Sequence, residues 1–346
     1  MTTNLSQLRK DVESLVVNHG AQLMALQHID RAIKDSLDGF EKTVEVLVGP
    51  SRAGKSEIIR MLKEKYPPLR VDGRLVCPVL FVPIKSGVSP KDLPLHVLRA
   101  LKVPRPRRAS RQEELNTRMY EQLELAGVRA VVFEECSHLV DVGSKVPPRQ
   151  ASDWFKDLME SQANVTVILV GLPRLVRLLE SNEQLCLRSG APFYFLPYQW
   201  ALPPDRAQFA GVCKAYVTKF EHYGCSFPVP LATLVRQLYA ISAGTIGVLV
   251  KFFRFVAALV KSPGLISMAD IDVALKRLNR AGDRKQSLSA EYQPAFEELL
   301  VDDHDLLIQY RAELDVYKIS APTVTEKRIQ ERKADFEMAH AWRAAW

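Results

Sequence analysis

The chain has 346 residues, 47% of them hydrophobic and 25% charged, and its formal net charge is +7. No apolar run reaches the ~18 residues of a membrane span. The first fifteen residues lack the apolar centre of a signal peptide, and the five cysteines include no C-x-x-C pair. These features exclude a membrane protein, argue against structural zinc, and predict a soluble, cytoplasmic protein of two or three domains.

The positive charge is concentrated before residue 282. From Gly282 to the end there are 9 Lys/Arg and 13 Asp/Glu, which gives −4, whereas residues 1–281 hold 38 and 27, which gives +11. A basic body predicts a polyanionic partner, most simply nucleic acid. A solvated basic surface is the alternative that charge alone leaves open.

Helical spacing of apolar residues over 5–38 predicts a helix, which Gly20 divides in two. A β-rich run over 43–48 then leads into GPSRAGKS, and the amphipathic stretch EIIRML follows. The loop fits G-x-x-x-x-G-K-[ST], the phosphate-binding motif that joins a strand to a helix. The nucleotide-binding residues predicted from it are Gly49, Pro50, Ser51, Arg52, Ala53, Gly54, Lys55, Ser56 and Glu57.

The chemistry of nucleotide binding explains this spacing. Glycines permit the backbone N–H groups to surround phosphate oxygens, and the following helix presents its N-terminal dipole to the anion. Lys55 is expected to reach the β- and γ-phosphates, and the Ser56 hydroxyl to bind Mg²⁺. A chance glycine turn is the alternative, and the strand before the loop and the helix after it argue against that alternative.

Pro67 and Pro68 end the helix, and the apolar run 75–84 predicts one buried strand, with its prolines near an edge or an end. A helix over 89–101 follows, and then the most basic stretch of the chain. This stretch has no aromatic residue for base stacking, so it predicts sequence-independent contact with phosphates; a flexible exposed linker is the alternative. The candidate DNA-binding residues of this stretch are Arg99, Lys102, Arg105, Arg107, Arg108 and Arg111. Lys91, earlier in the predicted helix, is a further candidate only through the family resemblance given below, whose DNA-facing loops correspond to residues 91–111.

A second nucleotide-site motif follows a predicted helix over 112–125. Four apolar residues at 130–133 precede Glu134 and Glu135, the pattern called Walker B. The first carboxylate is expected near Mg²⁺, where a glutamate replaces the usual aspartate, and Glu135 is expected to orient or deprotonate the attacking water. A plain polar strand end is the alternative.

The rest of the chain alternates buried strands with helices and then becomes helical. A loop over 142–150, a helix over 151–162, a strand over 165–171, a helix over 172–180 and a short strand over 193–196 predict a parallel α/β sheet. Helices over 204–223, 231–241, 245–261 and 269–281 predict a small helical lid. The acidic tail reads either as a partner-docking segment or as a solvated helix.

Taken in this order, the two motifs, the strand VTVILVG and the helical lid resemble an AAA+ ATPase. The strand exit Glu134-Glu135-Cys136-Ser137-His138 and the lid turn Ser242–Gly247 resemble the TniB/TnsC group of transposition ATPases more closely. The resemblance implies ATP and Mg²⁺ as cofactors, and assembly into rings or helical filaments on double-stranded DNA. It also implies partners, namely a DDE transposase and a TniQ-like target selector.

The group's arginine finger, which completes a neighbouring subunit's site, corresponds to Arg188, with Arg174 and Arg177 as rivals. Two departures from the AAA+ pattern predict slow, switch-like hydrolysis. The strand ending at Gly171 lacks the sensor 1 Asn or Thr, and the usual sensor 2 arginine is replaced by Gly247.

The sequence therefore predicts four parts: an N-terminal helical segment (1–40), an AAA+ α/β core (41–202), a helical lid (203–281) and a partner-docking tail (282–346). It predicts an ATPase that oligomerises on DNA in the bacterial cytoplasm and connects target selection to the transposase. Another AAA+ DNA-associated machine, such as a helicase loader or replication initiator, is one alternative. A non-hydrolysing, ATP-gated scaffold is the other.

Overall fold

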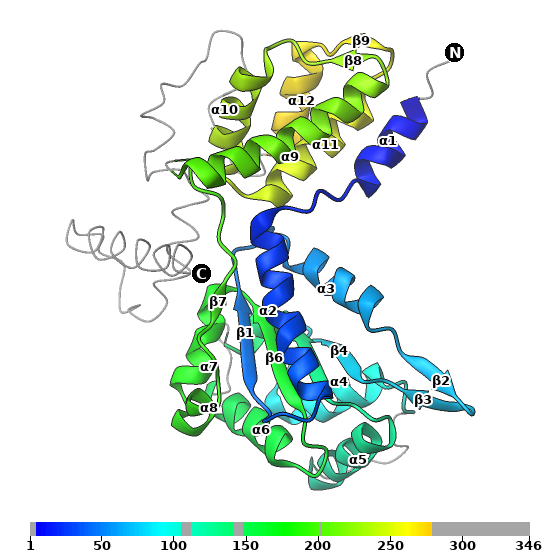
Figure 1. Cartoon of the computed structure of the whole chain (residues 1–346), viewed down its shortest axis with the longest axis vertical. Helices are drawn as coiled ribbons and strands as arrows, with labels where there is room; N and C mark the ends of the chain where they lie inside the picture. The colour runs from blue at the N-terminus through cyan, green and yellow to red at the C-terminus, as the bar shows by residue number, and fades with distance from the viewer. Residues whose placement is uncertain (1–4, 105–111, 141–147, 201, 279–346) are drawn as a thin grey trace, which may run out of the picture. The chain divides into compact units, whose positions relative to one another are not determined.

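The computed structural model describes residues 5–104, 112–140, 148–200 and 202–278. Contacts divide this part of the chain into two compact units (Figure 1). The core unit comprises Ala21–Ser51 and Lys55–Phe195. The lid unit comprises the residues up to Gly20, the segment Arg52–Gly54, and the chain from Leu196. The phosphate-loop motif therefore contributes residues to both units.

A five-stranded parallel sheet forms the centre of the core unit, and its order is β4-β5-β6-β1-β7. The strands alternate with helices along the chain, so each parallel neighbour is reached by a crossover. This confirms the predicted parallel α/β fold. The strands are β1 (Val44–Val48), β4 (Val79–Pro83), β5 (Ala130–Glu134), β6 (Thr166–Gly171) and β7 (Phe193–Tyr194).

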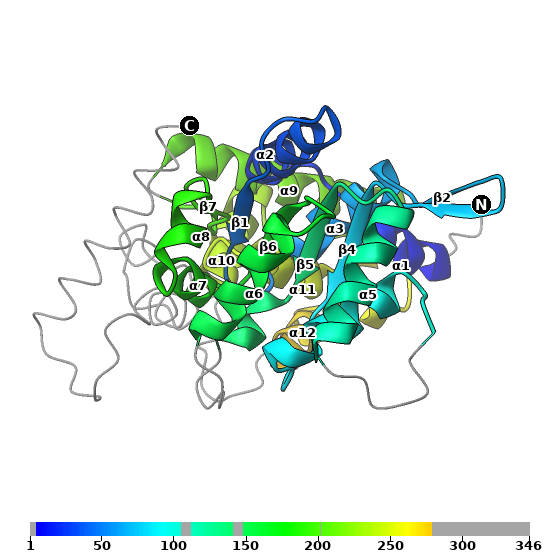
Figure 2. The same ribbon diagram turned by 90° about the horizontal axis from the view of Figure 1, so that it is seen from below.

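Helices cover both faces of this sheet, as Figure 2 shows for α2 on one side and α5 and α6 on the other. Strand residues alternate between the faces. Phe133 packs on Trp154 and Phe155 of α6, whereas its neighbour Glu134 binds Lys63 of α3 on the opposite face. The helices on the Glu134 face are α2 (Gly20–Leu37) and α3 (Lys55–Lys65); those on the Phe133 face include α4 (Leu93–Ala100), α5 (Gln112–Leu125) and α6 (Pro148–Glu160).

The predicted single strand over 75–84 is wrong. The run breaks at Cys77 and Pro78, where the Cys77 N–H donates to the Ala126 carbonyl at 2.8 Å and proline has no N–H for a sheet ladder. Before the break, β3 (Arg74–Val76) pairs antiparallel with β2 (Leu69–Val71) in an unpredicted hairpin. After it, β4 is the edge strand of the sheet, which confirms the edge position that the prolines indicated.

Shorter helices replace the single helix predicted over 172–180. They are the 3₁₀ turn η3 (Pro173–Val176), α7 (Arg177–Glu180) and α8 (Glu183–Leu187). A second 3₁₀ turn, η2 (Cys136–Leu139), follows β5, and η1 (Pro90–Asp92) precedes α4. Of the predicted loop over 142–150, residues 142–147 lie outside the described residues, and α6 already begins at Pro148.

The lid unit packs its helices around aromatic side chains. The rings of Tyr216 and Phe253 stack at 4.8 Å, and both are buried. The first helix docks on this cluster, because the Tyr216 hydroxyl donates to the Leu15 carbonyl at 2.9 Å and Tyr223 donates to Asp11 at 2.8 Å. The elements are α1 (Leu5–Ser14), α9 (Pro203–His222), β8 (Cys225–Ser226), α10 (Leu231–Ser242), α11 (Ile246–Leu259), β9 (Gly264–Leu265) and α12 (Met268–Leu278).

Among the described residues, no single helix is both long and apolar enough to cross a membrane; α10 and α11 reach that length only as a pair bent by 116°. Several predicted residues lie outside the part of the chain that the structure describes. They are Arg105, Arg107, Arg108 and Arg111 of the basic stretch, and the whole tail over 282–346.

Candidate nucleotide site

The phosphate loop begins at a close approach between two strand ends. The Gly49 N–H donates to the Gly171 carbonyl at 3.2 Å, and the Phe195 N–H donates to the Val48 carbonyl at 2.6 Å. A Cβ at position 49 would lie 2.5 Å from the Phe195 carbonyl oxygen, so a larger residue would displace that strand end. This contact explains why the loop starts with glycine.

Lys55 is folded inside the loop. Its Nζ donates to the carbonyls of Gly49 and Pro50, both at 2.8 Å, and the residue is only 8% exposed. The ammonium thus stands over the loop backbone at the first residue of α3, where the helix dipole also favours an anion. Ser56, the next residue, is exposed and available to a ligand, whereas the Glu57 carboxylate is bound by Arg60 on the same helix.

The tip of the loop belongs to the lid unit. Arg52 has φ 64° and Gly54 has φ 114°, and the Arg52 carbonyl accepts a hydrogen bond from the Gly247 N–H at 3.0 Å. A Cβ at Gly247 would overlap that carbonyl oxygen, and a Cβ at Gly244 would overlap the Tyr198 carbonyl oxygen. The lid turn therefore uses glycine where AAA+ proteins often carry an arginine, because the loop tip occupies the space a side chain would need.

A buried polar cluster in the lid unit joins the residues before α2 to the segment after β7. His19 Nδ1 lies 2.6 Å from the Tyr198 hydroxyl, and that hydroxyl donates to Gln208 Oε1 at 2.9 Å. The Gly20 N–H donates to the same Gln208 oxygen at 2.8 Å. No periodicity or motif in the sequence indicates this cluster, because His19 lies 179 positions before Tyr198 and Gly20 lies 188 positions before Gln208.

The first Walker B carboxylate is already paired. Glu134 Oε1 lies 2.6 Å from the Nζ of Lys63, two turns beyond the loop on α3, and that Nζ also stands 5.4 Å from the centre of the Phe81 ring. The Glu134 side chain is 20% exposed, so the ion pair is partly shielded from water. Sequence reasoning missed Lys63, since nothing in its spacing distinguishes it from other lysines of an amphipathic helix.

The second carboxylate, Glu135, is exposed and has a left-handed backbone with φ 59°. Non-glycine residues rarely adopt this conformation, and such strain concentrates at functional sites. The next residue, Cys136, is fully buried, and burial raises the pKa of its thiol, so it is not a nucleophile. The exposed acid at this strand end is therefore Glu135.

The missing sensor 1 side chain has a structural counterpart. A Cβ on Gly171 would lie 2.5 Å from the Ser137 Oγ, which accepts a hydrogen bond from the Leu172 N–H. Ser137 is 1% exposed. Ser137, the second residue after the Walker B carboxylates, thus fills the space beside the end of β6, and a larger residue at position 171 is excluded for that reason.

These residues fit a nucleotide with a metal bound mainly through phosphate. The loop supplies N–H groups and a buried ammonium, and Ser56 supplies a hydroxyl. Among the described residues, no three His, Cys, Asp or Glu side chains gather to hold a metal. Mg²⁺ at a nucleotide site typically keeps waters and phosphate oxygens with one or two protein ligands, so a hydroxyl and one nearby carboxylate suffice.

Arg188 lies at the amino-terminal end of strand β1, whereas its own phosphate loop lies at the carboxyl-terminal end of that strand. Its carbonyl accepts from the Val44 N–H at the start of β1, whereas the loop follows the end of that strand. The five residues of β1, at ~3.3 Å each, place the two ends of the strand roughly 16 Å apart. The guanidinium binds Glu160 at 2.8 Å and is 45% exposed, beside the exposed Leu187.

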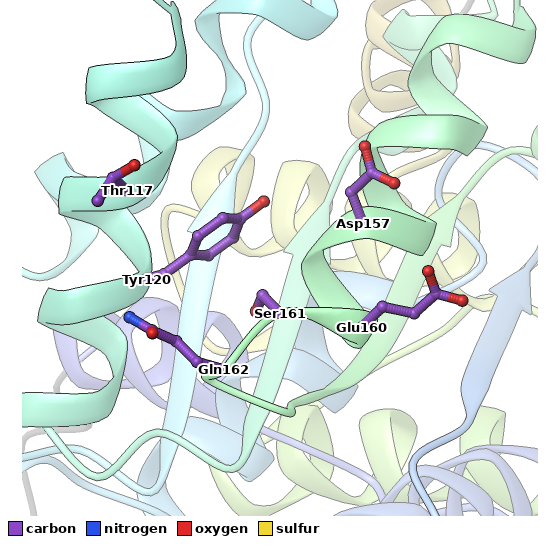
Figure 3. A pocket seen from close by; sticks show the side chains of 6 residues that line it. All are labelled: Thr117, Tyr120, Asp157, Glu160, Ser161 and Gln162. Carbon is purple, nitrogen blue, oxygen red and sulfur yellow. The ribbon is translucent and has the colours of Figure 1, made fainter.

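Glu160 also lines a polar pocket of about 310 Å³ between α5 and α6. Figure 3 shows Tyr120 pointing from α5 toward Asp157 on α6, with Glu160 farther along that helix. Burial raises the pKa of both Tyr120 and Asp157, and the neighbouring Asp157 carboxylate adds to the rise at Tyr120. Arg188 thus lies beside an acidic surface at the amino-terminal ends of the strands.

The two rival arginines lie at the other ends of the strands. Arg174 and Arg177 follow the carboxyl-terminal end of β6.

The described residues of the basic stretch fall into two groups. Lys91 lies in η1, before α4, whereas Arg99 and Lys102 lie together at the end of that helix, where the Lys102 N–H donates to the Arg99 carbonyl at 2.9 Å. All three are exposed. Eight helical residues span about 12 Å, so the structure brings Arg99 and Lys102 together and leaves Lys91 apart.

The fold and the loop geometry define a P-loop nucleotide-binding protein with the AAA+ fold. Solved structures with a similar fold include Cdc6p from Pyrobaculum aerophilum, at TM-score 0.55 and 15% identity, covering 78% of this chain and 70% of that one. Another is the Aeropyrum pernix ORC1 protein in complex with DNA, at TM-score 0.55 and 14% identity, covering 94% and 84%. At these identities the likeness concerns the fold.

A family comparison makes the assignment narrower. Residues 21–192 match the model described as bacterial TniB protein, and this range contains the phosphate loop, the Walker B strand and Arg188. The chain belongs, through this region, to the TniB family. No curated protein matched the chain.

Proposed function

We propose that this protein is an ATP-dependent, DNA-bound regulator of transposition. In this proposal it binds ATP with Mg²⁺, assembles on double-stranded DNA as a ring or helical filament, and connects a TniQ-like selector to the transposase in the bacterial cytoplasm. The observation that carries the proposal is the buried Lys55 ammonium over an intact phosphate loop, within a region that matches TniB.

The chain's own residues divide the work at the site. Bound ATP would supply the transferable phosphoryl group, and Mg²⁺ would neutralise its charge. Lys55 would turn from the loop carbonyls to the phosphates, Ser56 and Glu134 would hold the metal, and Glu135 would orient the attacking water. Because Glu134 is bound to Lys63, it must exchange that partner before it approaches a metal. This exchange is consistent with slow, switch-like turnover.

Arg188 is expected to act in trans. Its position about a strand length from its own loop prevents it from serving its own site, and its exposed side chain beside Leu187 suits a contact with another copy. Arg188→Ala should therefore reduce ATP- and DNA-dependent assembly, or turnover, by at least about tenfold, while the melting temperature of the free chain stays unchanged. Mass photometry with ATP and duplex DNA, alongside a phosphate-release assay, measures both.

The matched control for Arg188 is Arg149→Ala, an exposed arginine in the first turn of α6. Normal assembly together with normal turnover in the Arg188 variant would transfer the finger to Arg174 or Arg177. Failure of the unmodified chain to assemble with ATP and duplex DNA would contradict the proposed function itself.

DNA binding is expected to depend on phosphate contacts. Arg99 and Lys102 are exposed and adjacent, so Arg99→Ala with Lys102→Ala should flatten the log–log salt dependence of DNA affinity by up to about two units. Replacing Arg105, Arg107 and Arg108 by Ala should flatten it by up to about three. Fluorescence anisotropy across a salt series, at saturating ATP, gives the slope.

The comparison variant is Lys91→Ala, which lies apart from this pair and should change the slope by about one unit at most. An unchanged slope in the double and triple variants, with oligomers intact, would assign both groups to the solvated surface. Sequence preference should stay the same in every variant, because the sequence of the stretch from Arg99 to Arg111 contains no aromatic residue for base stacking.

A replication initiator is the second candidate, since the Cdc6p and ORC1 structures share the fold. The two functions differ in their partners. Stimulation of turnover or assembly by the transposase and a TniQ-like protein supports the first, and loading of a replicative helicase supports the second.

A further inference from the structure

A groove on the lid unit has no role in the nucleotide site. It lies between α9 and α10 and encloses about 880 Å³. Its α9 wall consists of Ala207, Ala210 and Gly211, which share one helix face at spacings of three and four residues. Ala207 and Gly211 are exposed, so the outer face of this helix presents small apolar residues where charged ones are usual.

The opposite wall is apolar and the margins are basic. Leu231 and Val235 of α10 line the wall, and Leu231 is 37% exposed. Arg206, Lys214 and Arg236 line the same groove, and the last two are exposed. A groove with two apolar walls and three cations at its margins is complementary to a segment that combines apolar side chains with carboxylates.

Gly211 is a further sign that something approaches this face. A Cβ added at Gly211 would meet nothing within 4 Å, so no packing in the described chain requires glycine there. Glycine also disfavours the interior of a helix. Because Gly211 has no side chain, the α9 wall of the groove is open to close approach by another backbone.

The chain itself contains a matching segment. The stretch from Phe296 to Tyr310, FEELLVDDHDLLIQY, has five acidic residues and no lysine or arginine, and eight of its residues are apolar or aromatic. Phe296 follows Leu278, the last described residue, by 18 positions. An extended linker of that length reaches about 60 Å, about twice the length of the 20-residue helix α9.

We propose that residues 296–310 dock in cis into the groove between α9 and α10 of the same lid. The apolar side chains of the segment pack against the small residues of the α9 wall, and its carboxylates form ion pairs with Lys214 and Arg236. Docking would join the acidic tail to the basic body of the chain. It would also cover the groove, so a partner protein that binds there would first have to displace the tail.

Zero-length carbodiimide cross-linking of the full chain tests this, because it joins an amine to a carboxylate only at ion-pair distance. The expected product is an amide between Lys214 and one of the acidic residues within 296–310, identified by mass spectrometry. Lys219 and Asp11, 3.9 Å apart in the same unit, provide an internal control for a folded lid. A 1:1 mixture of ¹⁴N- and ¹⁵N-labelled chains separates links within one chain from links between two.

Gly211→Trp in the full chain fills the groove without disturbing a packed neighbour. It should reduce the Lys214–tail product at least tenfold while the Lys219–Asp11 product is unchanged. Lys214→Arg, which keeps the charge and removes the amine, should eliminate the product. The proposal is overturned if the unmodified chain gives no Lys214–tail product, if the product survives Gly211→Trp, or if isotopically mixed products show that the tail comes from a second copy.

Discussion

Lys55→Ala is expected to raise the dissociation constant for ATP by at least about 100-fold. The buried ammonium donates to two loop carbonyls, and with ATP present the same donors are expected to turn to the β- and γ-phosphates. Charge-assisted hydrogen bonds contribute about 1.5–3 kcal/mol each, and about 1.4 kcal/mol is a factor of ten in affinity. Losing two such bonds therefore accounts for the predicted change. Isothermal titration calorimetry with ATP and Mg²⁺ measures it.

The matched control is Arg60→Ala, which removes another cation from the same helix. Within the described part of the chain, Arg60 is bound by Glu57 and Glu64, one turn away on either side, so its loss should leave the ATP affinity unchanged. ATP affinity that is unaltered in Lys55→Ala, with the fold intact by circular dichroism, would contradict the assignment of the phosphate loop.

Local patterns were sufficient to predict the central sheet and the two motif segments. The strands β5 and β6 are buried on both faces, so apolar runs that stand out from the chain mark them, whereas β1 was recognisable as a β-rich run interrupted at Glu45 and leading into the glycine loop. The hairpin β2–β3 did not stand out, because its first strand is fully exposed and only three residues long. The break at Pro78 was hidden for a different reason, since apolar residues continue on both sides of it.

Contacts between distant residues explain what sequence reasoning missed at the site. Lys63 reaches Glu134 across 71 positions, and only the packing of α3 on β5 brings them together. The glycines of the lid turn form a recognisable sequence motif, but the sequence does not show why glycine is required. The structure shows that the carbonyl oxygens of Arg52 and Tyr198 occupy the space that a side chain at Gly247 or Gly244 would need. The groove on α9 was also hidden, because an exposed row of alanine and glycine looks like ordinary helix sequence.

Glu135→Gln is expected to lower ATP turnover by about 10²–10⁴-fold and to leave ATP affinity unchanged. Glutamine preserves the size of the side chain and tolerates the left-handed backbone at φ 59° as well as glutamate does, so the loop geometry should be retained. What is lost is the carboxylate that accepts a proton from water, which matters for turnover and not for binding. Because Glu135 is exposed, its loss removes no buried contact, and the melting temperature should stay the same.

Single-turnover hydrolysis with saturating enzyme and duplex DNA measures the chemical step separately from product release. Glu124→Gln, an exposed change at the end of α5, is the neutral control. Glu134→Gln gives a contrasting result: Lys63 loses its partner, so this variant should alter the melting temperature and the Mg²⁺ dependence of ATP affinity. Turnover that persists in Glu135→Gln would mean that another group orients the water. A parallel loss of ATP affinity would mean that Glu135 supports the loop and does not act on the water alone.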